Sequence, residues 1–468
     1  MNIELTRDGQ VLVDAYRAWT GCGRLRADRQ RNKRFTFGDQ WTDPCVDREG
    51  NVMTEGERAI RSGAIPLTNN LLRQLIRSVV GRFCAEVIDH PGRQPEGALA
   101  EVYAKNLLDQ LDSRTLEEFL ISGCAIQRVE AGDDGLPSVS NVGVARWMVD
   151  VMEDPRGNDC QLIGQLHDLA LPDLLRRVAG GSRRKAQWVK RVYTSQPDTR
   201  AERWRTAIGA DSQSSTDFWH CEGNRLRAIE VWTRESEEVL VCHNRRTASL
   251  VRVPLSDTAA VRRMRADEDV QTAWDVSSHW RCRWFAPTGD LLASWRADRH
   301  PFAVKLYPLV DGEVHSFVEG AIDQQKHLNR LVTLVDHVMD NSAKGVLLFP
   351  ETALPDGFSW SDVRKAWSNA GGIIPYDPRE SNARPEQIVV NATDIGAYEM
   401  LRLQMQLLEQ VSGVSGALQG KSDQTGKSAQ LYEAQAENAN IALTDIYDSF
   451  AGFRAQRDAL INSFLNPS

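Results

Sequence analysis

The chain has 468 residues, enough to bury several hydrophobic cores, and its length suggests roughly two to four domains. Hydrophobic residues make up 41% and charged residues 26%, and no run of about 18 apolar residues is present to predict a membrane-spanning helix. The formal net charge of -8 argues against a protein that grips nucleic acid tightly through its phosphates, because such proteins are usually basic.

The N-terminal stretch 1–10 carries charged residues and no apolar core, which predicts a protein without a signal peptide that stays in the cytoplasm where it is made. The eight cysteines are scattered without a C-x-x-C pair. This spacing predicts reduced thiols and no metal site, and nothing in the sequence calls for a cofactor.

Residues 1–122 are predicted to be mainly helical, with helices over 1–35, 68–80 and 96–122. The basic run 24–34 is typical of a solvated helix face, with a nucleic-acid contact as the alternative. In the second helix, Thr68 or Asn69 can cap the N-terminus, and Gly81 lies near the predicted end.

Residues 123–315 change to a mixed α/β pattern. Short β-branched or alternating runs predict strands at 146–151, 228–233, 239–242, 281–285 and 302–307. Helical patterns intervene at 171–178, 183–205 and 258–269. His220, His243, His279 and His300 are isolated, so no catalytic constellation is predicted here.

The C-terminal part has a simple order of elements. A long amphipathic helix is predicted at 316–343, followed by a small α/β unit at 344–393 with strands at its two ends and a helix between them. A second long helix at 394–412, capped by Asp394, precedes a polar loop at 413–427 and a last helix over 428–468. The expected fold class is α+β.

The polar loop contains Gly426-Lys427-Ser428, which resembles the end of a phosphate-binding loop. That motif requires four residues between its glycines and a buried strand before it. Here five residues separate Gly420 from Gly426, and a Leu/Met-rich helix precedes the loop. The favoured interpretation is a polar loop carrying Lys421 and Lys427. A nucleotide-dependent nucleic-acid enzyme that uses Lys427 remains the alternative, and a different structural or scaffold protein with helical hairpins is a third possibility.

The order of elements over 316–466 resembles the portal (head-to-tail connector) protein of tailed bacteriophages. Short motifs add to the resemblance: Gly38-Asp39-Gln40-Trp41 followed by Asn70-Leu71-Leu72, and the segment 320–329 with its Ile-Asp and a later Asn. Gly413-Val414-Ser415-Gly416 and 425–429 are similar to the family's Gly-rich turn and Ser-Gly-x-Ala signature, although Ser428 separates Lys427 from Ala429. Residues 123–315 contribute little to the resemblance.

The resemblance implies a non-enzymatic subunit of a ring, usually a dodecamer, at one capsid vertex, assembled in the host cytoplasm. It implies that double-stranded DNA is packaged and ejected through the ring. The implied parts are a wing (1–122 helical, 123–315 mixed), stem helices (316–343 and 394–412), a clip (344–393), a tunnel loop (413–427) and a long C-terminal wing helix (428–468) with a crown minimal or absent.

The same resemblance implies partners and site residues. The partners are other copies of the chain, the large terminase, the major capsid and scaffolding proteins and a head-tail adaptor, with no membrane. The DNA-facing tunnel loop would comprise Lys421, Ser422, Asp423, Gln424 and Lys427. Clip residues that dock terminase or adaptor would be Trp360, Arg364, Lys365 and Trp367, and stem-lining residues Glu319, Asp323, Lys326, Arg330 and Asp340.

Overall fold

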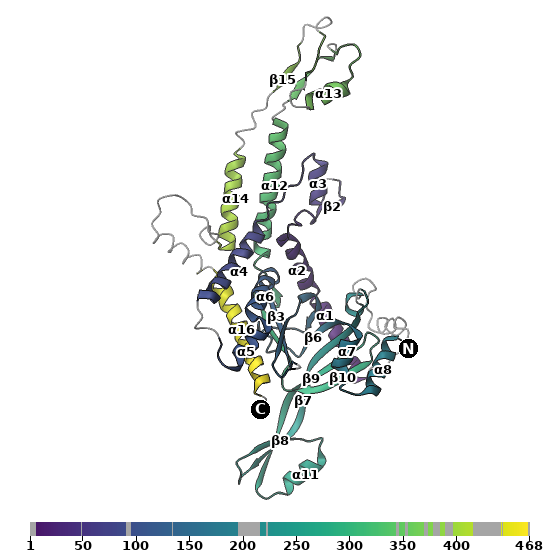
Figure 1. Cartoon of the computed structure of the whole chain (residues 1–468), viewed down its shortest axis with the longest axis vertical. Helices are drawn as coiled ribbons and strands as arrows, with labels where there is room; N and C mark the ends of the chain where they lie inside the picture. The colour runs from purple at the N-terminus through teal and green to yellow at the C-terminus, as the bar shows by residue number, and fades with distance from the viewer. Residues whose placement is uncertain are drawn as a thin grey trace. The chain divides into compact units, whose positions relative to one another are not determined.

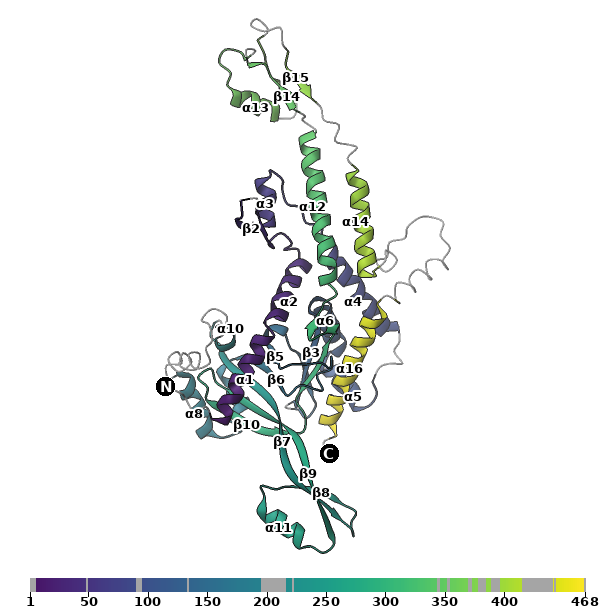
Figure 2. The ribbon, with the colours of Figure 1, turned by 180° about the vertical axis from the view of Figure 1, so that it is seen from behind.

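The computed structural model describes residues 6–47, 49–89, 95–132, 134–194, 216–220, 223–342, 346–351, 354–368, 373–377, 384–388, 396–414, 441 and 443–466 (Figures 1 and 2). The chain divides into two compact units. The first comprises Met1–Gln30, Phe83–Ser316 and Asp445–Ser468, and the second comprises Arg31–Arg82 and Phe317–Thr444.

The first unit is built on two antiparallel sheets. The larger sheet has six strands: β5 (Trp147–Val149), β6 (Leu162–Leu169), β7 (Leu226–Asn244), β8 (Leu250–Pro254), β9 (Val270–Phe285) and β10 (Leu291–Ala297). Their order is β10-β9-β7-β6-β5, with β8 also paired to β7. The smaller sheet has the order β11-β3-β4, from β3 (Cys124–Glu130), β4 (Ser138–Asn141) and β11 (Phe302–Leu306).

The helices of the first unit cover these sheets. They are α1 (Arg7–Gly21), α5 (Ala98–Asn106), α6 (Leu108–Ser122), α7 (Leu171–Val178), α8 (Arg183–Thr194), α10 (Thr216–Trp219), α11 (Thr258–Ala266) and α16 (Thr444–Leu465). A 3-10 turn (Val144–Arg146) and the two-stranded pair β12 (Leu309–Val310) and β13 (Glu313–Val314) complete this unit. Helices α2 (Gly23–Thr36) and α4 (Leu71–Asp89) run from one unit into the other.

The large sheet buries both of its faces, because successive side chains of a strand point in opposite directions. On one face, Ile229 and Val231 pack with α1 and α10 in a core that includes Trp19 and Trp219. On the other face, Ala228 and Trp232 pack with residues of the smaller sheet and of α7 and α8. Glu230 lies between these last two positions on β7 and therefore faces the core between the sheets.

Strands β7 and β9 pair from Ile229↔Phe285 to Asn244↔Val270, and beyond Arg234↔Trp280 they continue past β6 and β10 as a two-stranded ribbon. The far part of the ribbon has a small hydrophobic core of its own, which α11 and β8 complete. The sequence patterns at 228–233 and 239–242 predict two separate strands, and this is wrong. The polar residues between them belong to one continuous strand whose middle has little to pack against.

The second unit contains β1 (Pro44–Val46), β2 (Val52–Thr54), α3 (Glu55–Arg61), α12 (Glu319–Ser342), β14 (Val346–Leu348), α13 (Trp360–Ser368), β15 (Glu386–Ile388) and α14 (Ala397–Ser412). Thr54 and Glu57 form a capping box that starts α3. The strands predicted at both ends of 344–393 are confirmed as β14 and β15, which pair antiparallel, and the helix between them is α13.

Three predicted helices differ from those observed. The helix expected over 1–35 is interrupted at Cys22, where glycines on both sides weaken helical propensity. The helix expected over 96–122 breaks at Leu107, which adopts the left-handed conformation with φ 49°. The helix expected over 68–80 runs on through Gly81 to Asp89, and its cap is Asn70, whose side chain accepts from the Arg73 amide at 3.1 Å.

Candidate functional site

One face of α12 carries three polar side chains one helical turn apart, Gln325, Asn329 and Thr333, and all three are buried. They bind the backbone that leads into α4. The oxygen of Gln325 accepts from the Leu71 amide at 3.1 Å, and that of Thr333 accepts from the Leu67 amide at 3.0 Å. We call these three residues the amide ladder. It satisfies backbone donors that the start of α4 would otherwise leave unpaired.

The amide ladder brings the separate sequence motifs together. Asn329 accepts from the Asn69 amide at 3.1 Å and donates to the side-chain oxygen of Gln40 at 2.6 Å. Gln40 in turn donates to Asn70 at 3.2 Å, and the Trp41 indole donates to Thr68 at 3.1 Å. Gly38–Trp41, the Asn70 helix start and segment 320–329 therefore form one hydrogen-bonded site.

Replacing Asn329 with leucine should lower the free energy of unfolding by about 1–3 kcal/mol, because the Asn69 amide and the Gln40 side chain would lose buried partners. Urea denaturation of the subunit measures the effect. Asp323→Ala, an exposed change on the same helix, should stay within about 0.5 kcal/mol of the wild type. Equal stability of the Asn329 variant and the wild type would contradict a stabilising ladder.

Two buried carboxylates lie beside the ladder. Asp43 and Glu55 are both less than a tenth exposed. Lys326 lies 2.6 Å from Asp43 and 3.3 Å from Glu55, and Arg330 lies 2.8 Å from Glu55. Burial alone would raise the pKa of Asp43, but hydrogen bonds from Lys326 and Arg31 lower it below its ordinary value. The carboxylate is thus ionised and neutralises cations of its own subunit.

The structure describes the side chains of four of the five residues expected to line a stem. Lys326 and Arg330 direct their charges to Asp43 and Glu55, whereas Asp323 is exposed and Glu319 half-buried. Asp340 belongs to α12, but its side chain lies outside the described residues. That any of these side chains faces a channel stays a prediction.

Helices α12 and α14 pack side by side and antiparallel (Figures 1 and 2). The Tyr398 hydroxyl lies 3.7 Å from the Met339 sulfur, so the start of α14 meets the end of α12. A groove of about 570 Å³ lies between the two helices. Its lining includes Leu331, Leu334, Met400 and Leu403, with Glu399 and Arg402 also present.

The segment with β14, α13 and β15 carries the predicted docking residues. Trp360 is 44% exposed and makes an edge-to-face contact with Phe349, with ring centroids 5.8 Å apart. Arg364 and Lys365 are exposed, while Trp367 is half-buried. All four lie on α13, and their role in docking stays a prediction.

The predicted tunnel-loop residues Lys421, Ser422, Asp423, Gln424 and Lys427 lie outside the described residues. So do Asp394, the expected cap of the second long helix, and most of 428–443. Helix α14 before the loop ends at Ser412, and Gly413 after it takes the left-handed conformation with φ 67° that glycine favours. The prediction that a helix rather than a strand precedes the loop is confirmed. A phosphate-binding loop follows a strand, so this arrangement does not fit that motif.

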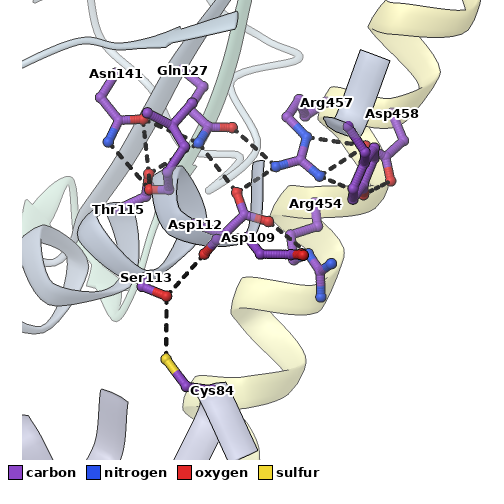
Figure 3. Close-up of polar contacts among 12 residues, drawn as sticks. Cys84, Asp109, Asp112, Ser113, Thr115, Gln127, Asn141, Arg454, Arg457 and Asp458 are labelled. Carbon is purple, nitrogen blue, oxygen red and sulfur yellow. Dashed lines mark hydrogen bonds and ion pairs between the residues drawn. The ribbon is translucent and has the colours of Figure 1, made fainter. Parts of the chain in front are cut away.

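A buried arginine holds α16 in the first unit (Figure 3). Arg457 is fully buried and forms an ion pair with Asp112 of α6, which is fully buried as well. Arg457 also donates to the side-chain oxygen of Gln127 at 3.4 Å and to the Tyr103 hydroxyl at 2.6 Å. Arg454, one turn earlier on α16, lies 2.9 Å from the other oxygen of Asp112.

The tyrosine in this cluster acts as a neutral bridge. Burial raises the pKa of Tyr103 to about 12, so its hydroxyl keeps its proton and donates to Asp458 at 2.8 Å. No sequence motif predicts this cluster. In the sequence, Arg457 is a charged residue at a position where the helical pattern between Phe453 and Leu460 predicts an apolar side chain.

A second buried cluster joins the two sheets of the first unit. Glu230 of β7 forms an ion pair with Arg128 of β3, and it accepts from His167 and the Trp232 indole, each at 2.7 Å. Burial alone would raise the pKa of Glu230, but the charge of Arg128 and the hydrogen bond from His167 lower it far below its ordinary value. The histidine stacks on Trp284, so this arrangement suits a core tie between sheets.

No group of three or more His, Cys, Asp or Glu side chains is placed to hold a metal ion within the described ranges. In the same part of the chain, none of the helices combines the length and hydrophobicity that crossing a membrane requires.

Comparison with known families defines the class of protein as a phage portal protein. The matching family is described as "Phage P22-like portal protein", and the match spans residues 181–457. Because this range is more than half of the chain, the protein belongs to the P22-like phage portal family. No individual curated protein matches the chain significantly.

The matched range corrects one sequence-based interpretation. Residues 181–315, with β7 to β11, are part of the family match, although residues 123–315 had been expected to contribute little to the resemblance. The family is structural rather than enzymatic, and membership associates the protein with the phage capsid and with DNA packaging.

Proposed function

We propose that copies of this chain form a ring at one vertex of the capsid, a dodecamer as the sequence resemblance implies. Double-stranded DNA would pass through this ring during packaging and ejection. The observation that carries the proposal is the family match over residues 181–457. The antiparallel pair α12–α14, followed by a polar loop and α16, supports it because the order suits a stem with a loop at its inner end.

In this proposal α12 and α14 are the stem, 344–393 is the clip that binds the large terminase and later the head-tail adaptor, and 413–427 is the tunnel loop. The remaining residues form a wing that contacts the major capsid and scaffolding proteins. The ring is made in the host cytoplasm and becomes part of the virion.

The charges of the described residues suit a conduit in which DNA slides. DNA carries about one charge per 1.7 Å, so a row of free cations would hold it in place. On α12, Lys326 and Arg330 are neutralised by Asp43 and Glu55 of the same subunit, while Asp323 remains exposed. A stem surface of this kind attracts DNA weakly.

Replacing Lys421 and Lys427 together with alanine tests the tunnel loop. We expect rings to form as in the wild type, since the change removes only two loop charges, and we expect DNA packaging or retention to fall. Negative-stain images of rings and the DNA content of purified heads measure the two effects. The double variant Lys33→Ala/Lys190→Ala, which removes two exposed lysines outside the loop, is the control. Full heads from the lysine variant would refute the assignment of this loop.

A further inference from the structure

Helix α12 has two opposed faces. Residues of an α-helix advance by about 100° each, so the centre of the amide ladder lies roughly opposite the centre of the pair Leu331 and Leu334. The ladder binds the segment that contains α3 and the start of α4, and the leucines line the groove with α14. Figures 1 and 2 show α12 between α3 and α14.

The segment on the ladder side exposes large apolar side chains. Val46 and Val52 are directly opposite each other in the β1–β2 pair and therefore share one face. They are 62% and 76% exposed, and Ile60 and Ile65 are 64% and 70% exposed. We call residues 44–65 the tongue. Four such side chains within so short a segment are more than the scattered apolar residues of an ordinary surface.

The groove on the other side of α12 is also apolar and open. Leu334, Met400 and Leu403 are each about half exposed: 53%, 50% and 48%. Its rim carries Glu399 and Arg402, which lie about one turn apart on α14 and are both exposed. The tongue offers matching charges, because Glu57 and Arg61 lie about one turn apart on α3 and are also exposed.

A ring imposes a requirement on these two surfaces. Neighbours in a closed ring meet head to tail, so each subunit presents two different, complementary patches on opposite sides. We propose that the tongue of one subunit docks in the α12–α14 groove of the next. This inference rests on the proposed ring and goes further by naming its interface: the apolar tongue fills the groove, and Glu57 and Arg61 face Arg402 and Glu399.

The amide ladder has a second role in this arrangement. It fixes the base of the tongue to the α12 face opposite the groove through the Leu67 and Leu71 amides. The angle between the two docking surfaces of one subunit is therefore set within a single helix. A constant angle between the two contact surfaces is the condition for a chain of subunits to close into a ring.

Cysteine cross-linking tests the pairing. Two full-length variants, Ile60→Cys and Leu403→Cys, are mixed under assembly conditions and treated with a short bismaleimide, with each variant alone and the wild type as controls for native cysteines. We expect covalent dimers from the mixture well above those from either variant alone. This result places the tongue of one subunit at the groove of another, because a tongue–tongue or groove–groove contact would cross-link a single variant instead.

Ring formation measured on further variants completes the test. Leu403→Asp should reduce the fraction of protein in rings at least tenfold, whereas Val151→Asp, at an 82% exposed position in the first unit, should leave it unchanged. Two results would overturn the docking while leaving the proposed function intact. One is normal ring formation without mixed covalent dimers, and the other is normal ring formation by the Leu403→Asp variant. A wild-type chain that never forms rings would instead refute the proposed function.

Discussion

Replacing Glu230 with glutamine should lower the free energy of unfolding by about 3–5 kcal/mol. This effect and that of replacing Arg457 are the two largest that we expect from single substitutions. Glutamine keeps the shape of the side chain but removes its charge. Arg128 would remain in the core between the sheets, 7% exposed at its side chain, with only Glu130 to compensate it. Urea denaturation of the unassembled subunit measures the loss.

The pH dependence of stability distinguishes a charge effect from a packing effect. Because the pKa of Glu230 is lowered in the folded state, its contribution is complete above the ordinary value of 4.5 and is lost as the pH falls toward the folded pKa. The glutamine variant should lose this part of the acid sensitivity. Glu238→Gln, on the exposed part of the same strand, is the matched control and should change stability by less than about 0.5 kcal/mol. A Glu230 variant as stable as this control would contradict the prediction.

Replacing Arg457 with methionine should also cost about 3–5 kcal/mol, because the fully buried Asp112 would keep only Arg454 as a cationic partner. Methionine fills much of the space, so the loss reports mainly on the missing charge and hydrogen bonds. The melting temperature of the subunit measures it. Since α16 follows the proposed tunnel loop in the chain, the variant should also yield fewer rings.

A double-mutant cycle measures the interaction energy between Arg457 and Asp112 separately from the contacts that each makes with other residues. Exchanging Asp112 for leucine together with Arg457→Met removes both buried charges, and such exchanges are often close to neutral. The double variant should therefore be more stable than Arg457→Met alone. Additive losses would show that the two side chains act independently. Arg454→Met, whose side chain is 26% exposed, should cost less than Arg457→Met.

Local sequence patterns predicted a helix or strand correctly where one face of that element is apolar. The long helix expected at 316–343 is α12, and the α/β unit expected at 344–393 contains β14, α13 and β15. Leu171–Val178 is helical as expected. Sequence patterns gave the wrong element where its limits depend on a backbone conformation or on pairing with a segment distant in the chain. Leu107 breaks a helix although no Gly or Pro marks it, and the ribbon of β7 has a polar middle that resembles a turn.

The sequence by itself determined the order of helices and strands and the resemblance to portal proteins, because hydrophobic periodicity and short motifs are local properties. Only the tertiary structure decided which polar residues act together. Gln40, Asn70 and Asn329 belong to three motifs but one hydrogen-bonded site, and Asp112 and Arg457 are 345 residues apart. A charged residue in a sequence looks the same whether it is solvated or buried. Its role is fixed by the partner that folding places beside it.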